Sequence, residues 1–202
     1  MGWRGKSWLL GLLLELLVVG AHAQPARAQT ATQAAGPFFL TLHLAGGTGV
    51  VALGGGYRLA QQRLEPELLL GYVPRRISGS KPLAIITLKA TYLPWTPELG
   101  RSSWQASPVT LGAMVNYTTG QQFFLTNNSA GNYRPGYYWW SSAVRLGLLA
   151  GTRLSYAGPC RQPTAAYAEL STNDLHLVSA LTNHSLRLVD ILTLGGGFKQ
   201  GF

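Results

Sequence analysis

The chain has 202 residues, and only 11% of them are charged, well below the roughly 25% of an ordinary soluble domain. The formal net charge is +9, but the lysines and arginines are scattered singly, whereas a nucleic-acid surface gathers them into a patch. Cys160 is the single cysteine, so no internal disulfide can form, and the histidines lack metal-ligand spacing. We therefore expect no nucleic acid, metal or cofactor.

Residues 1–23 have the features of an export signal. Arg4 and Lys6 precede the apolar run Trp8–Gly20, which is too short to span a bilayer as a helix. Cleavage is expected after Ala23, where small residues occupy the positions that a signal peptidase reads; a second small-residue site follows at Ala28. A retained N-terminal anchor helix is the alternative.

The remaining chain divides into a short N-terminal tail, residues 24–36, and one domain, residues 37–202. No linker interrupts this domain. After residue 30 no stretch approaches twenty continuous apolar residues, so a membrane-spanning helix is excluded there. A protein with this little charge that resides in a membrane must then be a closed β-barrel, because every backbone polar group needs a partner within lipid.

Apolar and polar residues alternate with a period of two in eight segments, which predicts an all-β, up-and-down, antiparallel transmembrane barrel of about eight strands. Pro66 lies inside one segment and is expected to mark a bulge. An even strand number returns both ends of the domain to the same side. The segments are 38–45, 50–59, 63–72, 85–92, 109–117, 143–151, 165–171 and 192–202.

The polar face of these segments is expected to line the lumen. It carries glycines, which suit a narrow interior, and charges of both signs that can pair across the barrel. A soluble lipocalin-like barrel, with its apolar face turned inward, is the alternative. The predicted lumen charges are Arg58, Arg63, Glu65, Glu67, Lys89, Arg145, Arg153, Glu169 and Lys199.

Aromatic residues of the apolar face stand at the segment ends and aliphatic residues hold the middle. Tyr57, Tyr72, Tyr92 and Tyr117 close their segments, and Trp95 follows shortly after the third of these. This distribution is typical of the aromatic girdle that lies at the membrane interface.

Loop lengths favour an outer side with the connections 46–49, 73–82, 118–139 and 172–187. The inner connections, 60–62, 93–107 and about 154–164, are longer than usual for that side. One outer loop is rich in aromatic residues, and either packs on itself over the barrel mouth or presents a partner site. Its aromatic cluster is Phe123, Phe124, Tyr137, Tyr138, Trp139 and Trp140.

The last segment resembles the terminal strand of bacterial outer-membrane β-barrel proteins. Those proteins commonly end in Phe with apolar residues at alternate positions, a pattern read by the barrel assembly machinery; Phe198 and Phe202 match it, and Gln200 departs from it. The resemblance implies export through the periplasm to the outer membrane, with lipid and lipopolysaccharide as neighbours. It identifies a class with porin-like architecture, not a specific family, and no activity follows from it.

Eight strands enclose a space just wide enough for side chains, which makes a diffusion pore unfavourable. We expect a structural or surface-interaction role, with small-ligand or ion passage as one alternative. A second alternative is an enzyme similar to the lipid A deacylases, which use His, Ser and an acidic residue near the outer face. Asp174, His176 and His184 are weak candidates for that role, because their spacing does not reproduce the deacylase motif.

Overall fold

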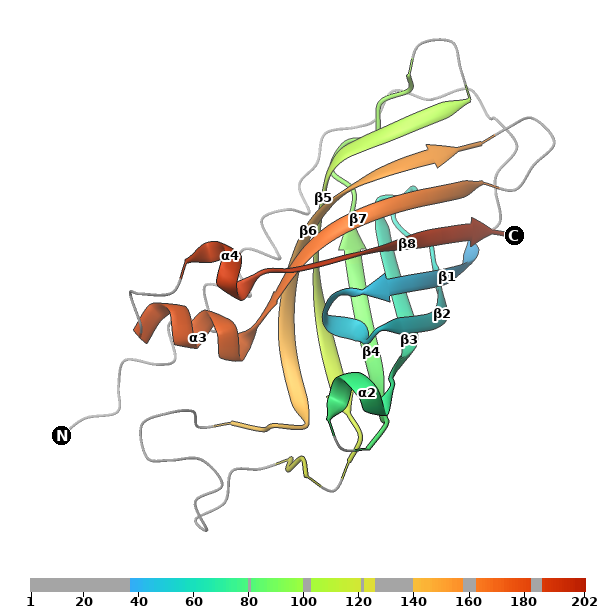
Figure 1. The fold of residues 1–202 in the computed structure, drawn as a ribbon. Helices are drawn as coiled ribbons and strands as arrows, with labels where there is room; N and C mark the ends of the chain where they lie inside the picture. Colours follow the sequence, from blue (N-terminus) through green and yellow to red (C-terminus); the bar gives the residue numbers. More distant parts are fainter. Residues whose placement is uncertain are drawn as a thin grey trace. The chain divides into compact units, whose positions relative to one another are not determined.

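The computed structural model describes residues 37–79, 81–99, 103–120, 122–125, 140–157, 163–182 and 187–202. The predicted signal peptide, the tail before Pro37, Cys160 and His184 lie outside these ranges. Every strand pairs antiparallel with its neighbours in chain order, and the first strand closes on the last (Figure 1). The strands are β1 Phe38–Ala45, β2 Val51–Tyr57, β3 Leu64–Val73, β4 Leu83–Tyr92, β5 Trp104–Thr118, β6 Val144–Tyr156, β7 Thr164–Asn173 and β8 Thr193–Gly201.

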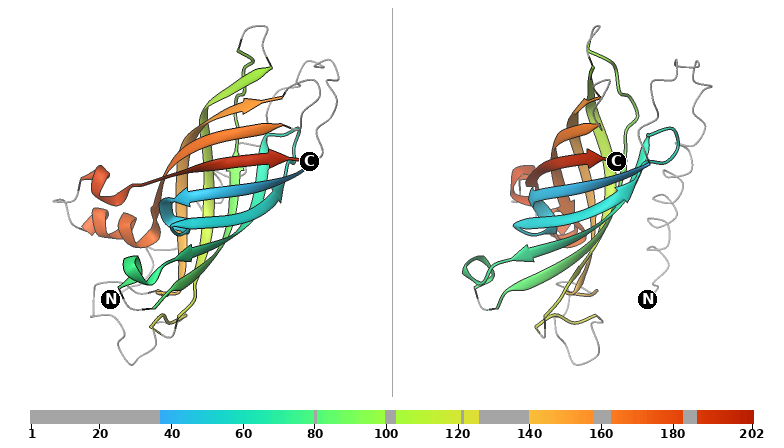
Figure 2. Two further views of the ribbon diagram at one scale, coloured as in Figure 1. Left: turned by 45° about the vertical axis from the view of Figure 1, so that its right-hand side comes forward. Right: turned by 90° about the vertical axis from the view of Figure 1, so that its right-hand side faces the viewer.

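Short helices follow the strands at one end of the barrel, the end opposite the C-terminus (Figures 1 and 2). They are η1 Gly46–Thr48, α2 Arg75–Ser78, α3 Asp174–Thr182 and α4 Leu188–Ile191. At the start of α3 the Asn173 side chain accepts a hydrogen bond from the His176 backbone N–H at 2.9 Å, which caps the helix. In the described ranges no helix combines the length and apolarity needed to cross a bilayer.

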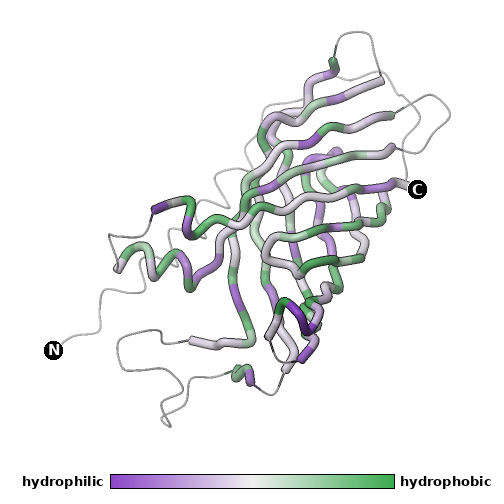
Figure 3. Tube along the Cα trace, viewed as in Figure 1, coloured by the Kyte–Doolittle hydropathy of each residue, from purple (hydrophilic) through white to green (hydrophobic). Residues whose placement is uncertain are grey.

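The closed eight-strand antiparallel barrel confirms the fold that the alternation predicts. The aliphatic residues of the strands face outward and the residues between them face the lumen, also as predicted. Along β1, Phe38, Leu40, Leu42 and Leu44 are exposed, while the residues between them are buried. The same alternation of hydrophilic and hydrophobic residues runs along the other strands (Figure 3). The pattern arises because successive side chains of a strand point to opposite faces of the sheet.

The prediction of a bulge at Pro66 is wrong. Its pairing with β4 is continuous, and on its other edge the β2 ladder stops one residue away, at Gly56 and Glu67. Leu64 and Leu59 exchange backbone hydrogen bonds, so the even-numbered residues of β3 direct their backbone polar groups toward β2. The missing N–H of Pro66 therefore falls in the interruption between the last β2–β3 pair, Gly56 and Glu67, and the isolated bridge between Leu59 and Leu64. The register shift of the sheet lies instead between Ser107 and Thr110, around Pro108.

Two strands are longer than the apolar alternation indicates. β5 begins at Trp104 and β6 continues to Tyr156, and these two residues pair with their rings 4.9 Å apart. The added segments were missed because WQASP and TRLSY lack a regular apolar alternation. Part of the predicted inner connections 93–107 and 154–164 is therefore strand, which leaves residues 93–103 and 157–163 between strands. The connection predicted at 60–62 is longer than expected and comprises residues 58–63.

Candidate functional site

A chain of buried ion pairs crosses the lumen, and Glu65 of β3 is at one end of it. Lys199 Nζ donates to Glu65 Oε2 at 2.9 Å, and Arg153 Nη1 donates to Glu65 Oε1 at 2.9 Å. Arg58 Nε lies 3.5 Å from the same carboxylate. Glu65 is 1% exposed, so it depends on these three cations for its stabilisation.

Glu67, two residues along β3, continues the chain. It accepts hydrogen bonds from Lys199 Nζ at 3.0 Å and from the Thr41 hydroxyl at 2.8 Å, and Lys89 Nζ lies 3.3 Å away. Lys89 in turn donates to both carboxylate oxygens of Glu169, at 3.0 and 2.8 Å. Anionic and cationic groups thus alternate along the chain, from Glu65 through Lys199, Glu67 and Lys89 to Glu169, and each interior carboxylate has a cationic partner.

Aromatic rings that sequence reasoning did not single out complete this interior. Lys199 Nζ lies 4.7 Å from the centre of the Phe39 ring, and Lys89 Nζ lies 4.9 Å from that of Tyr167, which adds cation–π attraction. The Tyr167 hydroxyl is 2.7 Å from His43 Nδ1, and the two rings stack. Phe39, His43 and Tyr167 stand on the predicted polar face of their strands. The alternation with a period of two could therefore have placed these three residues in the lumen.

Little space remains among these side chains. The gap bounded by Lys89, Arg153, Tyr167, Glu169 and Lys199, with Thr91 and Thr110, holds about 10 Å³. A cavity needs roughly 10–15 Å³ of such volume to admit one water molecule. This level of the barrel is therefore filled by protein.

The β1–β2 turn, η1, bends inward and plugs the lumen above the ion pairs. Asn116 Nδ2 of β5 donates to the Gly47 carbonyl at 2.9 Å, and Thr48 is 1% exposed. Gly71 of β3 permits this approach, because a Cβ there would lie 1.8 Å from the Thr48 carbonyl oxygen. Gly46 adopts a φ of 70°, a left-handed conformation that favours glycine.

Between η1 and the helical end of the barrel lies a mouth pocket of about 190 Å³. Most of its lining residues have polar side chains, and Arg145 is the cationic residue among them. Its lining residues are Gly47, Met114, Asn116, Thr118, Arg145, Ser171, Thr172, Asn173 and Thr193.

Two of the predicted lumen charges stand apart from the ion-pair chain. Arg145 lines the mouth pocket, and its Nη1 lies 4.0 Å from Asp174 Oδ2 rather than beside a lumen glutamate. Arg63 is half-buried in the turn before β3, and within the described residues it forms no ion pair. The other seven predicted charges converge as one network.

The candidate enzyme residues do not form a catalytic array in the described part of the chain. Asp174 lies beside Arg145, and His176 Nδ1 is 3.3 Å from the Ile191 carbonyl, which joins α3 to α4. His184 lies outside the described residues. Nor do the described His, Cys, Asp and Glu side chains include a group of three placed to hold a metal ion.

The described part of the aromatic loop is closed at its base by hydrogen bonds to the Phe124 backbone. The Phe124 carbonyl accepts hydrogen bonds from the Ser141 hydroxyl at 2.8 Å and from the Ala143 backbone N–H at 3.1 Å. Phe123, Phe124 and Trp140 are half-buried. Tyr137, Tyr138 and Trp139 lie outside the described residues, so the choice between self-packing and a partner site is untested.

The predicted assembly-signal residues of the last strand face outward. Phe198 and Phe202 are 55% and 53% exposed. The Phe202 backbone N–H donates to the Phe38 carbonyl at 3.1 Å, and the two rings lie 6.1 Å apart. The C-terminal residue thus joins the first strand at the closure of the barrel.

Comparisons with protein-family models, with curated proteins and with solved structures gave no match.

Proposed function

We propose that this protein spans a bacterial outer membrane as an integral barrel, after export with residues 1–23 as a cleaved signal. The observation that carries the proposal is the reversal of the usual burial pattern. Leu53, Leu68, Leu70 and Leu194 are each more than half exposed on the outer face. Lys89 and Lys199, by contrast, are 1% and 2% exposed on the inner face. Acyl chains would remove the cost of leaving that aliphatic surface in water.

The exposed aliphatic belt has members on all eight strands, which argues against the soluble alternative. A lipocalin-like barrel turns its apolar face inward to hold a ligand, whereas here that direction holds glutamates and lysines. A soluble monomer rarely exposes contiguous apolar surface on this scale. The belt comprises Leu40, Leu42, Leu44, Val51, Leu53, Leu68, Leu70, Ile86, Leu88, Val109, Leu111, Val115, Leu146, Leu148, Leu154, Leu170 and Leu194.

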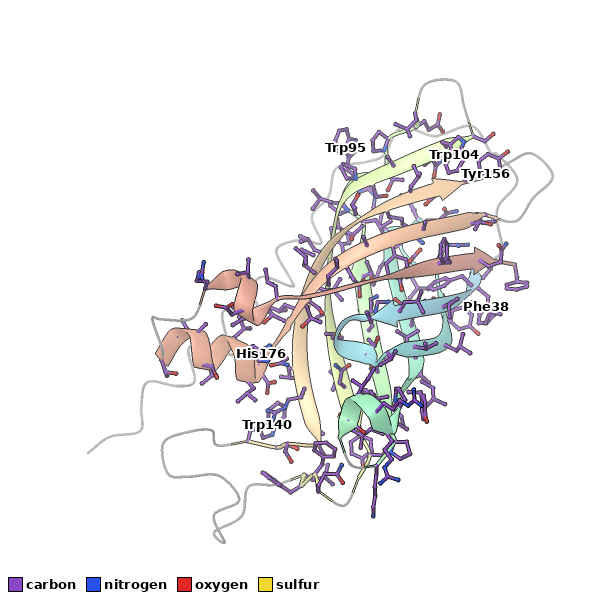
Figure 4. The ribbon with its side chains drawn as sticks, viewed as in Figure 1. Phe38, Trp95, Trp104, Trp140, Tyr156 and His176 are labelled. Atoms are coloured by element: carbon purple, nitrogen blue, oxygen red, sulfur yellow. The ribbon has the colours of Figure 1, made fainter. Side chains whose placement is uncertain are left out.

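Aromatic side chains at the two ends of this belt are consistent with two interfacial girdles. Phe38, Trp95, Trp104 and Tyr156 gather at the end that carries the C-terminus (Figure 4). Tyr117, near the end of β5, is 40% exposed at the opposite end. Tyr and Trp prefer the headgroup region because their rings are apolar and their N–H or O–H groups need polar partners.

The filled lumen favours a structural or surface-interaction role over transport. Two layers close it, the inward η1 turn and the ion-pair chain beneath, and ion passage would require both to rearrange. The resemblance of the last strand to outer-membrane barrels adds the barrel assembly machinery as a partner, with Phe198 and Phe202 as the recognised residues. Lipid and lipopolysaccharide would surround the belt.

Fractionation of cells that express the full chain tests this proposal. We expect the protein in the outer-membrane fraction, with its mass reduced by removal of the first 23 residues. On gels it should migrate differently before and after boiling, because a closed barrel resists detergent until heated. Recovery of folded protein from the soluble periplasm without detergent would contradict the proposal.

A further inference from the structure

The connection between β3 and β4 gathers positive charge at the helical end of the barrel. Arg75 and Arg76 in α2 and Lys81 before β4 are exposed, and within the described residues none of the three forms an ion pair. The sequence has no Asp or Glu between Glu67 and Glu98, so no acidic neighbour in the chain offsets these charges. Figure 2 shows α2 at the ends of β3 and β4. We call residues 75–81 the basic loop.

Contacts within the basic loop bring its two ends together. The Ser78 hydroxyl donates to the Lys81 carbonyl at 2.6 Å and lies 3.4 Å from the Arg75 carbonyl. Gly79 has a φ of 81°, a left-handed conformation that favours glycine, and its N–H donates to the Arg75 carbonyl at 3.0 Å. The cations are therefore presented from one compact turn. Such a group suits a phosphate, which offers several oxygens to guanidinium and ammonium donors.

An exposed apolar side chain distinguishes the basic loop from an ordinary solvated turn. Ile77 is 64% exposed among the cations, and the outward residues of β3 that lead toward it are Leu68, Leu70 and Tyr72, at 56%, 61% and 53%. The side chains thus change from aliphatic to aromatic to cationic toward this end of the barrel. A membrane lipid has the same order, from acyl chains through the interface to the phosphate. A free anion would need the cations alone.

We propose that the basic loop binds the phosphate groups of lipopolysaccharide. Arg75, Arg76 and Lys81 provide the charges, and Ile77 contacts the acyl chains. The inference rests on the proposed function, because only a barrel in the outer membrane meets lipopolysaccharide. It requires the helical end to face outward, which is the orientation that the loop lengths favour.

Native mass spectrometry of the protein, purified in neutral detergent from cells that express the full chain, tests the site. The probe is lipid A, the phosphorylated anchor of lipopolysaccharide, and lipid A without its phosphates is the matched control. We expect the protein to retain the phosphorylated form and to bind the control weakly. Phosphatidylglycerol and inorganic phosphate serve as competing sources of the same chemistry.

Variants of exposed residues assign the binding to the basic loop without disturbing the core. Arg75→Gln/Arg76→Gln should weaken lipid A binding about thirtyfold, from the typical contribution of two arginines near an anionic surface. Arg75→Lys/Arg76→Lys retains the charge and should retain most of the affinity. Arg63→Gln, in the turn before β3 at the opposite end of the barrel, is the control and should bind as the native chain does.

Ile77→Ser tests the contact with the acyl chains. It leaves the three cations in place, and we expect lipid A affinity to fall about tenfold because an apolar contact is lost. Unchanged affinity in this variant, or displacement of lipid A by inorganic phosphate at equal concentration, would overturn the proposal in favour of a site for free anions.

The remaining outcomes separate this inference from the proposed function. Equal affinity in Arg75→Gln/Arg76→Gln and the native chain, or tighter binding of phosphatidylglycerol than of lipid A, would overturn the site. Fractionation of the same cells then shows how far the failure extends. A barrel in the outer membrane that does not bind lipid A refutes the basic-loop site alone, whereas folded protein in the soluble periplasm refutes both proposals.

Discussion

The ammonium group of Lys199 in the last strand lies 2.9 Å from the Glu65 carboxylate in the third strand, and both side chains are buried. The two residues are 134 positions apart, and the strands that carry them are separated by β1 and β2. This contact therefore ties the barrel together across its closure. It also leaves each charge dependent on the other, since neither has access to bulk water.

Replacement of this lysine should destabilise the barrel strongly. In Lys199→Met, Glu65 and Glu67 each lose a partner, and the loss of one member of a buried ion pair typically costs about 3–5 kcal/mol. The measurement is urea unfolding in detergent, followed by the mobility shift on unboiled gels. Lys81→Met, at an exposed position between α2 and β4, is the control and should leave the midpoint unchanged. Equal midpoints for the two variants would show that the lumen network contributes little.

Substitution of a leucine of the aliphatic belt by arginine should show whether this surface faces lipid or water. Leu68 is 56% exposed in the middle of β3, and Leu125 is 60% exposed after β5. In a bilayer, Leu68→Arg should cost about 2–4 kcal/mol, the range for arginine near the midplane of a membrane barrel. Leu125→Arg should cost far less. Refolding into short-chain lipid vesicles measures both; similar small effects would point to a barrel surrounded by water.

The η1 plug should depend on the absence of a side chain at Gly71. In Gly71→Ala the new methyl group meets the Thr48 carbonyl, so the turn or the strand must shift, at a cost of about 1–3 kcal/mol. Ala113→Val adds atoms on the outer face of β5 and serves as the control. Hydrogen exchange of the β1–β2 turn should accelerate only in the first variant. Unchanged exchange would mean that the turn does not need this contact.

The filled lumen should not conduct. With about 10 Å³ of space at the level of Lys89 and Arg153, the barrel lacks room for a hydrated ion. Planar bilayers that contain the refolded protein should remain at baseline conductance, and a porin of known conductance serves as the positive control. Stable single-channel steps from the unmodified chain would contradict a closed interior.

The deacylase alternative has its own test at His176. Because its ring nitrogen contacts the Ile191 carbonyl, we expect His176→Ala to loosen the contact between α3 and α4 without altering lipid A. Mass spectrometry of lipid A from cells with the native chain, with His176→Ala and without the gene should give the same profile. Loss of an acyl chain that depends on His176 would restore the enzyme hypothesis.

The sequence by itself determined the strand number and the face that the strand residues take. With a period of two, the aliphatic residues of a strand fall on one face and the charged residues on the other. It also placed Glu65, Glu67, Lys89, Glu169 and Lys199 inside the barrel. The local sequence pattern gave a wrong prediction at Pro66, because the β2–β3 pairing is interrupted there and tolerates the missing N–H. It also missed the ends of β5 and β6 at Trp104 and Tyr156, because pairing between the two strands extends them where the apolar alternation is lost.

Only the tertiary structure decided which charges pair, because closure of the sheet brings β3, β4, β7 and β8 around one lumen regardless of their separation in sequence. It assigned Arg145 to the mouth beside Asp174 rather than to the ion-pair chain. It also turned the β1–β2 connection inward to form a plug, and thereby created the mouth pocket. The local sequence of the turn does not predict this position, because the position depends on contacts with Asn116 in β5 and Gly71 in β3, which lie later in the chain.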